Sequence, residues 1–279
     1  MKKISRRSFL AAAGLSVAAL ALTACGGSSA STASSVASSA ASSEAASTSA
    51  AAGELATVEA GKLTMATNAA FPPYEMTTDA GEFEGIDIET AQAIADKLGL
   101  ELQIDDMDFD AALLSVQQGK ADIVMAGVTV TDERKAVMDF SDSYATGIQS
   151  IIVPNDSDIA SPDDLAGKKI GTQRGTTGYI YCSDDFGDEN VVAYDDGLTA
   201  VQALNNGQVD AVVIDNAPAQ EFIAANPGLK ILDTSYAEED YAIGMAKGSS
   251  LEDVVNAALE ELKADGTLQS IVDKYITAE

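Results

Sequence analysis

Strand-like and helix-like patterns alternate along the chain from residue 62 onwards, and this alternation limits the possible folds more than any other feature of the sequence. One helix is predicted over 86–98, because its apolar residues lie on one face and Gly99 can end it. The strand-like segments are 62–67, 100–104, 121–126 and 149–153. Strands and helices in this order predict an α/β protein with mostly parallel sheets covered by helices.

Capping residues place two more helices. Asp110 can cap a helix that continues through Gln118 and ends at Gly119, and Thr131 can cap a short helix that contains Arg134. Both helices follow strand-like segments, as the alternating pattern requires.

An internal similarity indicates two lobes of like design. Residues 112–126 and 200–214 each read as a helix, a glycine stop, an aspartate and a strand, with four identities in 15 positions. Such units also recur in ordinary α/β proteins, so both interpretations stay open. Gly127 and Asp215 follow the two strands directly. Because ligands of open α/β sheets bind at the carboxyl ends of strands, both residues are candidates for a shared cleft.

The composition excludes several classes of function. The chain has 44 acidic and 16 basic residues, a net charge of −28, which argues against nucleic-acid binding. Histidine is absent, and this excludes Ser-His-Asp and Cys-His nucleophiles and His-ligated metal sites. We therefore expect neither a metal nor a cofactor. The two cysteines, Cys25 and Cys182, rule out a disulfide framework, and Cys182 is expected to be half-buried and unreactive.

The first 24 residues predict an export signal. Basic residues at 2, 3, 6 and 7 precede an apolar run over 9–22, which is shorter than the ~20 residues of a membrane span. The run ends in Leu22-Thr23-Ala24-Cys25, which resembles the lipobox of bacterial lipoproteins, so we expect cleavage before Cys25 and lipidation of its thiol. Residues 5–10 also resemble a twin-arginine signal, and ordinary secretion is equally compatible.

A low-complexity segment separates this signal from the globular body. Of the residues 26–53, all but Val36 and Glu44 are Gly, Ser, Ala or Thr, so a disordered linker is predicted over 25–56, with a reach of roughly 30 Å. The body is expected to begin near Thr57. Without its signal the chain has 12 basic and 44 acidic residues, a net charge of −32, so its own charge would not hold it on an anionic membrane.

Two arginines remain beyond the signal, Arg134 and Arg174. The guanidinium fork matches a carboxylate with two hydrogen bonds. Arg134 follows Gly127 on a loop that leaves a strand end, where glycine lets the backbone approach a ligand. The alternative for Arg134 is a surface salt bridge with Asp132 or Glu133.

A glycine-rich loop over 169–178 predicts an anion site. It runs from a strand through Gly175, Thr176 and Thr177 into a helix, where unpaired N–H groups and the helix dipole attract negative charge. The alternative is that Thr177 only caps the helix. No GxxxxGK[ST] pattern occurs, so a carboxylate is expected and not a nucleotide.

Three further residues each have a structural and a functional interpretation. Asp215 ends an apolar strand and either caps a helix over 217–225 or binds a ligand ammonium. Phe71 and Phe109 are either ordinary core residues or apolar walls around a small ligand.

These stretches together resemble the extracytoplasmic solute-binding proteins of polar amino-acid ABC transporters, the family of the glutamine- and lysine/arginine/ornithine-binding proteins. Order and spacing match from about residue 57 to 279. The stretches that carry the resemblance are Ala-Ala-Phe-Pro-Pro-Tyr-Glu at 69–75, Gly-Ile-Asp-Ile-Glu at 85–89, and the segments 126–134, 140–144, 164–168, 209–215 and 266–268.

The resemblance implies the α/β periplasmic-binding-protein fold, in which two lobes of mixed sheets flanked by helices are joined by two hinge strands. The hinge strands are expected near 149–153 and 231–241. Lobe 1 would comprise 57–150 and 236–279, and lobe 2 would comprise 151–235.

The implied function is that of a monomeric, lipid-anchored binding protein at the extracytoplasmic face of the bacterial membrane. It would deliver a polar amino acid to an ABC permease, and its lipid would be its only membrane contact. One alternative is an enzyme similar to arogenate or prephenate dehydratases, which is disfavoured because no spare carboxylate beyond Asp215 is predicted in the cleft. Another is a ligand sensor for a membrane receptor.

The resemblance also implies a role for each site residue. Arg134 would bind the ligand α-carboxylate, helped by backbone N–H groups of Thr129 and Thr177, while Asp215 and the Gly127 carbonyl would bind the α-ammonium. The other predicted site residues surround the ligand side chain: Phe71 and Phe109 on its faces, Asn68 and Gln173 at its far end, and Thr176 on the anion loop.

The ligand side chain is predicted to be neutral and polar, like that of glutamine or cystine. Asn68 stands where relatives that bind cationic or amide side chains commonly carry Asp, so lysine and arginine are disfavoured. Arg174 beside the loop leaves an acidic ligand as an alternative.

Overall fold

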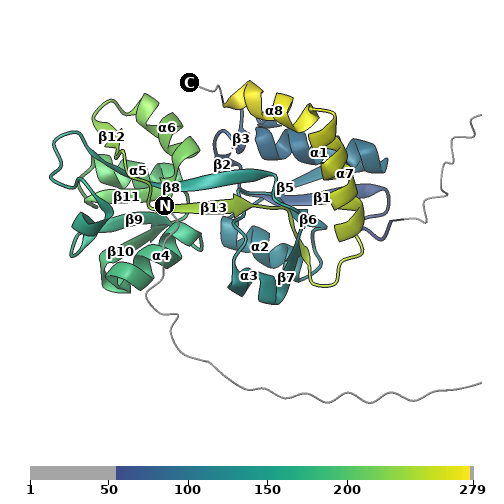
Figure 1. Ribbon diagram of the computed structural model, residues 1–279, viewed down its shortest axis with the longest axis horizontal. Helices are drawn as coiled ribbons and strands as arrows, with labels where there is room; N and C mark the ends of the chain where they lie inside the picture. The colour runs from purple at the N-terminus through teal and green to yellow at the C-terminus, as the bar shows by residue number, and fades with distance from the viewer. Residues whose placement is uncertain (1–54, 277–279) are drawn as a thin grey trace, which may run out of the picture. The chain divides into compact units, whose positions relative to one another are not determined.

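The computed structural model describes residues 55–276. The predicted signal peptide, the lipidated Cys25 and nearly all of the predicted linker lie outside these residues. Within the described part, no helix is both long and apolar enough to cross a membrane. Helices and strands alternate along it, as the sequence pattern predicts (Figure 1).

The first sheet is mixed and has the strand order β5-β1-β6-β14-β7. Strand β1 is parallel to β5 and β6, whereas β14 is antiparallel to β6 and β7. The strands are β1 (Lys62–Thr67), β5 (Glu101–Asp106), β6 (Ile123–Val124), β7 (Met138–Phe140) and β14 (Gly244–Ala246). The helices are α1 (Ile86–Leu98), α2 (Phe109–Gln117), α3 (Asp132–Val137), α7 (Glu252–Ala264) and α8 (Thr267–Tyr275). We call this sheet and its helices lobe 1.

The alternation along β1 explains how lobe 1 packs. Leu63 and Met65 point to the face that α1, α7 and α8 cover, and Ala66 points to the opposite face with the buried residues of α2. Helix α1 has the predicted bounds and ends at Gly99, which has a left-handed conformation.

The second sheet is also mixed, with the order β10-β9-β11-β8-β12, and β13 pairs with β8. Its strands are β8 (Ala145–Pro154), β9 (Ile170–Gln173), β10 (Val191–Tyr194), β11 (Ala211–Asp215), β12 (Leu229–Ile231) and β13 (Ala237–Tyr241). Its helices are α4 (Thr177–Phe186), α5 (Gly197–Asn205) and α6 (Asn216–Ala225), with 3-10 turns at Pro162–Leu165 and Asp188–Asn190. We call β9 to β12 and these helices lobe 2, and we treat β8 and β13 as the strand pair between the lobes. A small sheet of β2 (Ala70–Phe71), β3 (Glu75–Thr77) and β4 (Phe83–Glu84) completes the fold.

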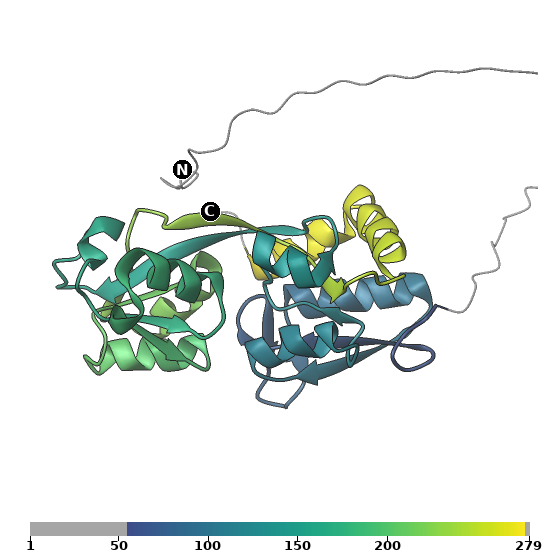
Figure 2. The same cartoon turned by 90° about the horizontal axis from the view of Figure 1, so that it is seen from below.

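Strands β8 and β13 form an antiparallel pair that runs from one lobe to the other (Figures 1 and 2). The pairing extends from Ala145 opposite Tyr241 to Gln149 opposite Ala237. The two predicted hinge segments overlap these strands, and the predicted fold class of two mixed sheets flanked by helices is confirmed.

The internal similarity corresponds to equivalent structure in the two lobes. Asp122, just before β6, accepts a hydrogen bond from the Thr64 backbone N–H at 2.8 Å, and Asp210, just before β11, accepts one from the Lys169 backbone N–H at 2.7 Å. Each aspartate therefore fastens its strand to the beginning of the neighbouring strand. The repeated aspartate has the same structural task in both copies.

Some local predictions were wrong. Helix α2 begins at Phe109 after Asp108, so Asp110 lies inside its first turn and is not its cap. The strand predicted over 121–126 is reduced to β6, since the chain turns away towards Gly127, whose φ is +55°. Cys182 is fully buried, because this face of α4 packs on Ile151 and Val213 of the second sheet.

Candidate functional site

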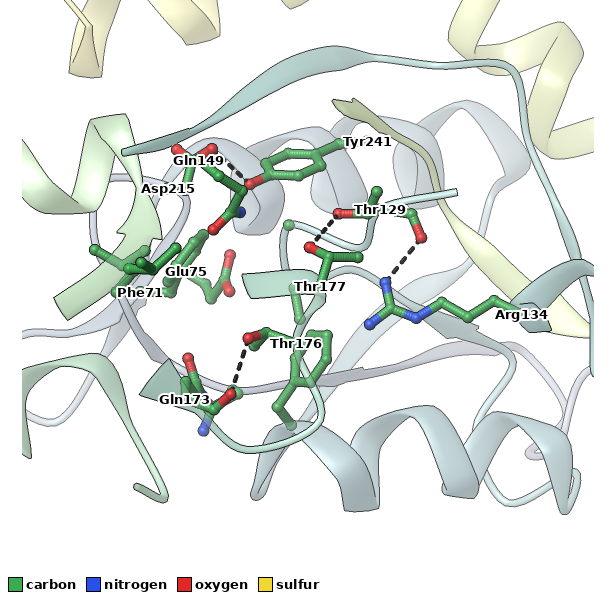
Figure 3. Close-up of a pocket in the computed structure, with 16 residues that line it drawn as sticks. Phe71, Glu75, Thr129, Arg134, Gln149, Gln173, Thr176, Thr177, Asp215 and Tyr241 are labelled. Atoms are coloured by element: carbon green, nitrogen blue, oxygen red, sulfur yellow. Dashed lines mark hydrogen bonds between the residues drawn. The ribbon is translucent and has the colours of Figure 1, made fainter. Parts of the chain in front are cut away.

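A pocket lies between the lobes, at the carboxyl ends of strands from both sheets (Figure 3). The empty space in and at the mouth of this pocket, open solvent included, is about 440 Å³. All ten residues predicted from the sequence line it: Asn68, Phe71, Phe109, Gly127, Thr129, Arg134, Gln173, Thr176, Thr177 and Asp215. In residues 55–276, no cluster of three or more His, Cys, Asp or Glu side chains is arranged to hold a metal ion.

Arg134 enters the pocket from α3, whose N-terminus Thr131 caps by accepting the Arg134 backbone N–H. Its side chain is buried, and the guanidinium donates to the Thr129 carbonyl at 2.8 Å and to the Gly175 carbonyl at 3.1 Å. The Gly175 contact joins lobe 1 to lobe 2. The alternative of a surface salt bridge with a neighbouring acid is therefore wrong. Two carbonyls use two of the five guanidinium donors, so the fork retains donors for a carboxylate.

Thr129 and Thr177 meet across the cleft, with their hydroxyl oxygens 3.4 Å apart. Thr129 lies opposite Tyr241 in an isolated antiparallel bridge, and the hydrogen bonds of this bridge belong to the neighbouring residues. The Thr129 N–H and C=O therefore point away from β13, and its carbonyl accepts from Arg134.

Helix α4 presents its N-terminus to the pocket. Its cap is Thr176, which accepts the Tyr179 backbone N–H, so the prediction of Thr177 as the cap was wrong by one residue. Thr177 is the first helical residue, and the first N–H groups of a helix have no partner inside the helix. The dipole at this end adds partial positive charge close to Arg134.

Asp215 ends β11, where it both caps a helix and faces the pocket. It caps α6 by accepting the Ala217 N–H at 3.1 Å, and it also lines the pocket. Its other oxygen accepts the Ile148 N–H and the Tyr241 hydroxyl, each at 2.8 Å. Burial raises the Asp215 pKa to about 6, although these hydrogen bonds oppose the shift. No cation is bonded to this carboxylate within residues 55–276, so a ligand ammonium would supply its missing countercharge.

Two glycines make room for this arrangement. A Cβ on Gly127 would lie 2.9 Å from the Phe71 ring, and its positive φ favours glycine in any case. A Cβ on Gly147 would lie 2.6 Å from the Tyr241 hydroxyl and 2.7 Å from Asp215 Oδ2. Both positions therefore require the absence of a side chain.

The two predicted aromatic walls line the pocket. Phe71 is half-buried and stacks on Tyr74 at 5.8 Å between ring centroids. Phe109 belongs to the core of lobe 1, and the Arg134 guanidinium lies over its ring, 5.4 Å from the centroid. Phe109 is therefore a core residue that also lines the pocket and has the arginine over its ring.

Asn68 and Gln173 hydrogen-bond to each other across the cleft. Gln173 Nε2 donates to Asn68 Oδ1 at 2.8 Å, and Asn68 Nδ2 donates to the Met107 carbonyl. By contrast, Arg174 does not line this pocket. Its side chain is more than half exposed, and its Nε lies 3.6 Å from Asp195 Oδ1. Because Arg174 is outside the pocket, it gives no support for an acidic ligand side chain.

Glu75 is the main residue that the sequence analysis did not place in the site. Its carboxylate points into the pocket (Figure 3), is fully buried, and neither oxygen accepts a hydrogen bond. Burial, followed by the charge of the neighbouring Asp87, raises the Glu75 pKa well above its usual range. The only sequence signal was its position in the Phe-Pro-Pro-Tyr-Glu stretch, which does not show that β3 turns this side chain inward.

Gln149 and Tyr241 also line the pocket, and neither was predicted. Both lie on the strand pair between the lobes, β8 and β13. In the sequence they look like ordinary residues of buried strands. Gln149 and Tyr241 become site residues only because β8 and β13 cross from one lobe to the other beside the pocket.

Comparison with known proteins identifies relatives of this chain. The sequence profile described as bacterial extracellular solute-binding proteins, family 3, matches residues 63–278. The L-cystine-binding protein TcyJ of Escherichia coli K12 is 32% identical over 225 residues, which cover 79% of this chain and 85% of that protein.

Solved structures show the same fold at higher identity. An ancestral arginine-binding protein bound to glutamine is 41% identical with a TM-score of 0.75, covering 79% of this chain and 100% of that one. An amino acid ABC transporter substrate-binding protein from Streptococcus pneumoniae, bound to L-arginine, is 37% identical with a TM-score of 0.73, covering 77% and 94%.

Proposed function

Because the chain belongs to the bacterial extracellular solute-binding proteins of family 3, we propose that it binds an amino acid in the pocket between its lobes and delivers it to an ABC permease. The relatives named above bind cystine, glutamine or arginine, and one belongs to an amino acid ABC transporter. The family consists of solute-binding proteins, and the chain is accordingly not an enzyme.

One observation carries this proposal: a buried arginine from lobe 1 and a buried aspartate from lobe 2 line the same pocket. Arg134 is 8% exposed and Asp215 is 2% exposed. An α-amino acid brings a carboxylate and an ammonium on one carbon, and both need charged partners once they leave water. Arg134, with the N–H groups of Thr129 and Thr177, would bind the carboxylate. Asp215 and the Gly127 carbonyl would bind the ammonium.

The rest of the pocket supports a polar ligand side chain that ends in N–H donors. Phe71 and Phe109 would cover its faces, and the amide oxygens of Asn68 and Gln173 can accept hydrogen bonds at its end. The sequence predicted a neutral side chain. Glu75 adds an acid to the pocket, and this widens our proposal to cationic side chains such as that of arginine.

A thermal-shift screen of the proteinogenic amino acids and cystine tests the ligand class. At a ligand concentration of about 100 Kd, binding stabilises the folded protein by ~2.7 kcal/mol, which corresponds to an increase in Tm of roughly 5–10 °C for a body of this size. We expect glutamine and arginine to give the largest shifts and glutamate none. The amino acids that lack an α-carboxylate or α-ammonium through amidation or acetylation are the controls. A preference for glutamate would contradict the proposal.

The lipid anchor is part of the proposal and rests on the sequence alone. We propose that the chain is monomeric, with lobe 1 at 57–150 and 236–279 and lobe 2 at 151–235, and that Cys25 carries a lipid at the extracytoplasmic face of the membrane. Cys25→Ser is expected to move the protein from the detergent phase to the aqueous phase in phase partitioning. Cys182→Ser, at the buried thiol, is the matched control and should stay in the detergent phase. Detergent partitioning of Cys25→Ser would overturn the anchor.

A further inference from the structure

We infer that Glu239 is a positioning residue that ties the strand pair β8/β13 to both walls of the pocket and stabilises the closed arrangement of the lobes. Glu239 lies in the middle of β13, opposite Gly147 of β8, and its side chain is only 6% exposed. It does not line the pocket itself. The inference rests on the proposed function only in taking the pocket as the ligand site.

One carboxylate oxygen of Glu239 accepts two hydrogen bonds from residues that do line the pocket. Thr129 Oγ1 donates to Oε2 at 3.1 Å, and Gln149 Nε2 donates to the same oxygen at 3.0 Å. Thr129 follows β6 of lobe 1, whereas Gln149 pairs with Asp215 of lobe 2. A single buried oxygen on the strand pair therefore connects the two lobes.

The same contacts extend to the predicted carboxylate site. Thr129 donates its hydroxyl to Glu239 and accepts Arg134 Nη1 at its carbonyl, so it lies between the two charged groups. Burial lowers the Arg134 pKa, and the charge of Glu239 is the largest influence that opposes this shift. Glu239 thus orients Thr129 and places a negative charge near the buried guanidinium.

Opening of the cleft would break this connection. A rotation of the lobes about β8 and β13 moves Thr129 relative to Gln149, and one acceptor oxygen cannot follow both donors. Hinge-bending around a ligand is the established motion of periplasmic binding proteins. Without the carboxylate, the buried Thr129 hydroxyl and Gln149 amide lose their shared partner in the closed arrangement, which is the costly case for buried polar groups.

The test compares Glu239→Ala and Glu239→Gln with Asp240→Asn in the full chain. Asp240 is exposed on the same strand, so its variant removes one negative charge without touching the pocket residues. Hydrogen–deuterium exchange of the protein without added ligand reports opening at 127–131 and 174–179. We expect exchange there to be roughly tenfold faster in Glu239→Ala, which corresponds to ~1.4 kcal/mol. Glu239→Gln keeps an acceptor oxygen, so its exchange at both loops should be slow. The exchange of Asp240→Asn at both loops should equal that of the wild type.

The affinity for L-glutamine and L-arginine should fall about tenfold in Glu239→Ala, since a smaller fraction of the protein would be in the binding-competent arrangement. Unchanged exchange at both loops would overturn the inference. Equal acceleration in α7, far from the cleft, would show general destabilisation and would also overturn it. If residues 127–131 and 174–179 exchange as fast in Glu239→Gln as in Glu239→Ala, the hydrogen-bond explanation is wrong. The exchange result needs no ligand, so it stands even if neither amino acid binds and the proposed function fails.

Discussion

Arg134→Ala and Asp215→Ala are each expected to weaken binding of L-glutamine and L-arginine by thirtyfold or more. Either change leaves one charge of the bound amino acid buried without its partner, which costs about 2–5 kcal/mol. Because ~1.4 kcal/mol corresponds to tenfold in affinity, thirtyfold is about the lower end of this range. Titration calorimetry on the folded variants measures the effect directly.

Conservative variants separate charge from structure at these two positions. Asp215→Asn removes the charge but keeps a side chain that can cap α6, so it should lose affinity without the loss of stability expected for Asp215→Ala. Arg134→Lys keeps the charge but cannot copy the planar fork, so it should also bind more weakly. The N-acetylated ligands should bind poorly to the wild type. If both alanine variants bind within twofold of the wild type, the assignment of the clamp and of the cleft is wrong.

Glu75→Gln is expected to change the affinities for L-arginine and L-glutamine by different factors. L-arginine should bind about tenfold more weakly, because its guanidinium loses a buried carboxylate partner, whereas L-glutamine should change by less than about threefold. In the wild type without ligand, the raised Glu75 pKa keeps the carboxyl protonated to a higher pH than usual. Arginine binding should therefore release a proton and should strengthen as the pH rises. Calorimetry in buffers of different ionisation enthalpy counts the proton released.

Folding stability offers a second readout for Glu75 that needs no ligand. An acid whose pKa is higher in the folded than in the unfolded protein stabilises the fold fully below its unfolded pKa, and this contribution is lost as the pH rises through the folded pKa. The decrease in Tm between pH 5 and pH 8 should consequently be smaller in Glu75→Gln. Asp87, whose pKa burial raises to about 6, remains in both proteins and contributes to the decrease that is left. Equal loss of affinity for both ligands, or equal pH dependence, would exclude this role for Glu75.

Local sequence predicted the elements and most of the site because the signals are short-range. The apolar face and the glycine stop of α1 occupy adjacent turns, and Thr131 caps α3 three residues before the arginine it positions. Gly127 and Asp215 could be proposed as site residues because each follows a strand directly, where α/β sheets bind ligands, whereas Asn68 was proposed from the family resemblance. Where the local signal was ambiguous by one residue, as between Thr176 and Thr177, the predicted cap was wrong.

Tertiary structure alone decided which of these groups are buried together. Glu239 bonds to Thr129 across 110 residues of sequence and to Gln149 across 90, and no periodicity or motif links positions so far apart. Glu75 becomes a buried acid in the pocket, beside Asp87, only because its strand turns the side chain inward. Burial and charge pairing depend on how distant segments pack, whereas capping and periodicity depend on neighbours along the chain. The sequence by itself therefore determined the α/β elements and the strand-end positions of candidate site residues, and packing determined which of these residues are buried together and which charges surround them.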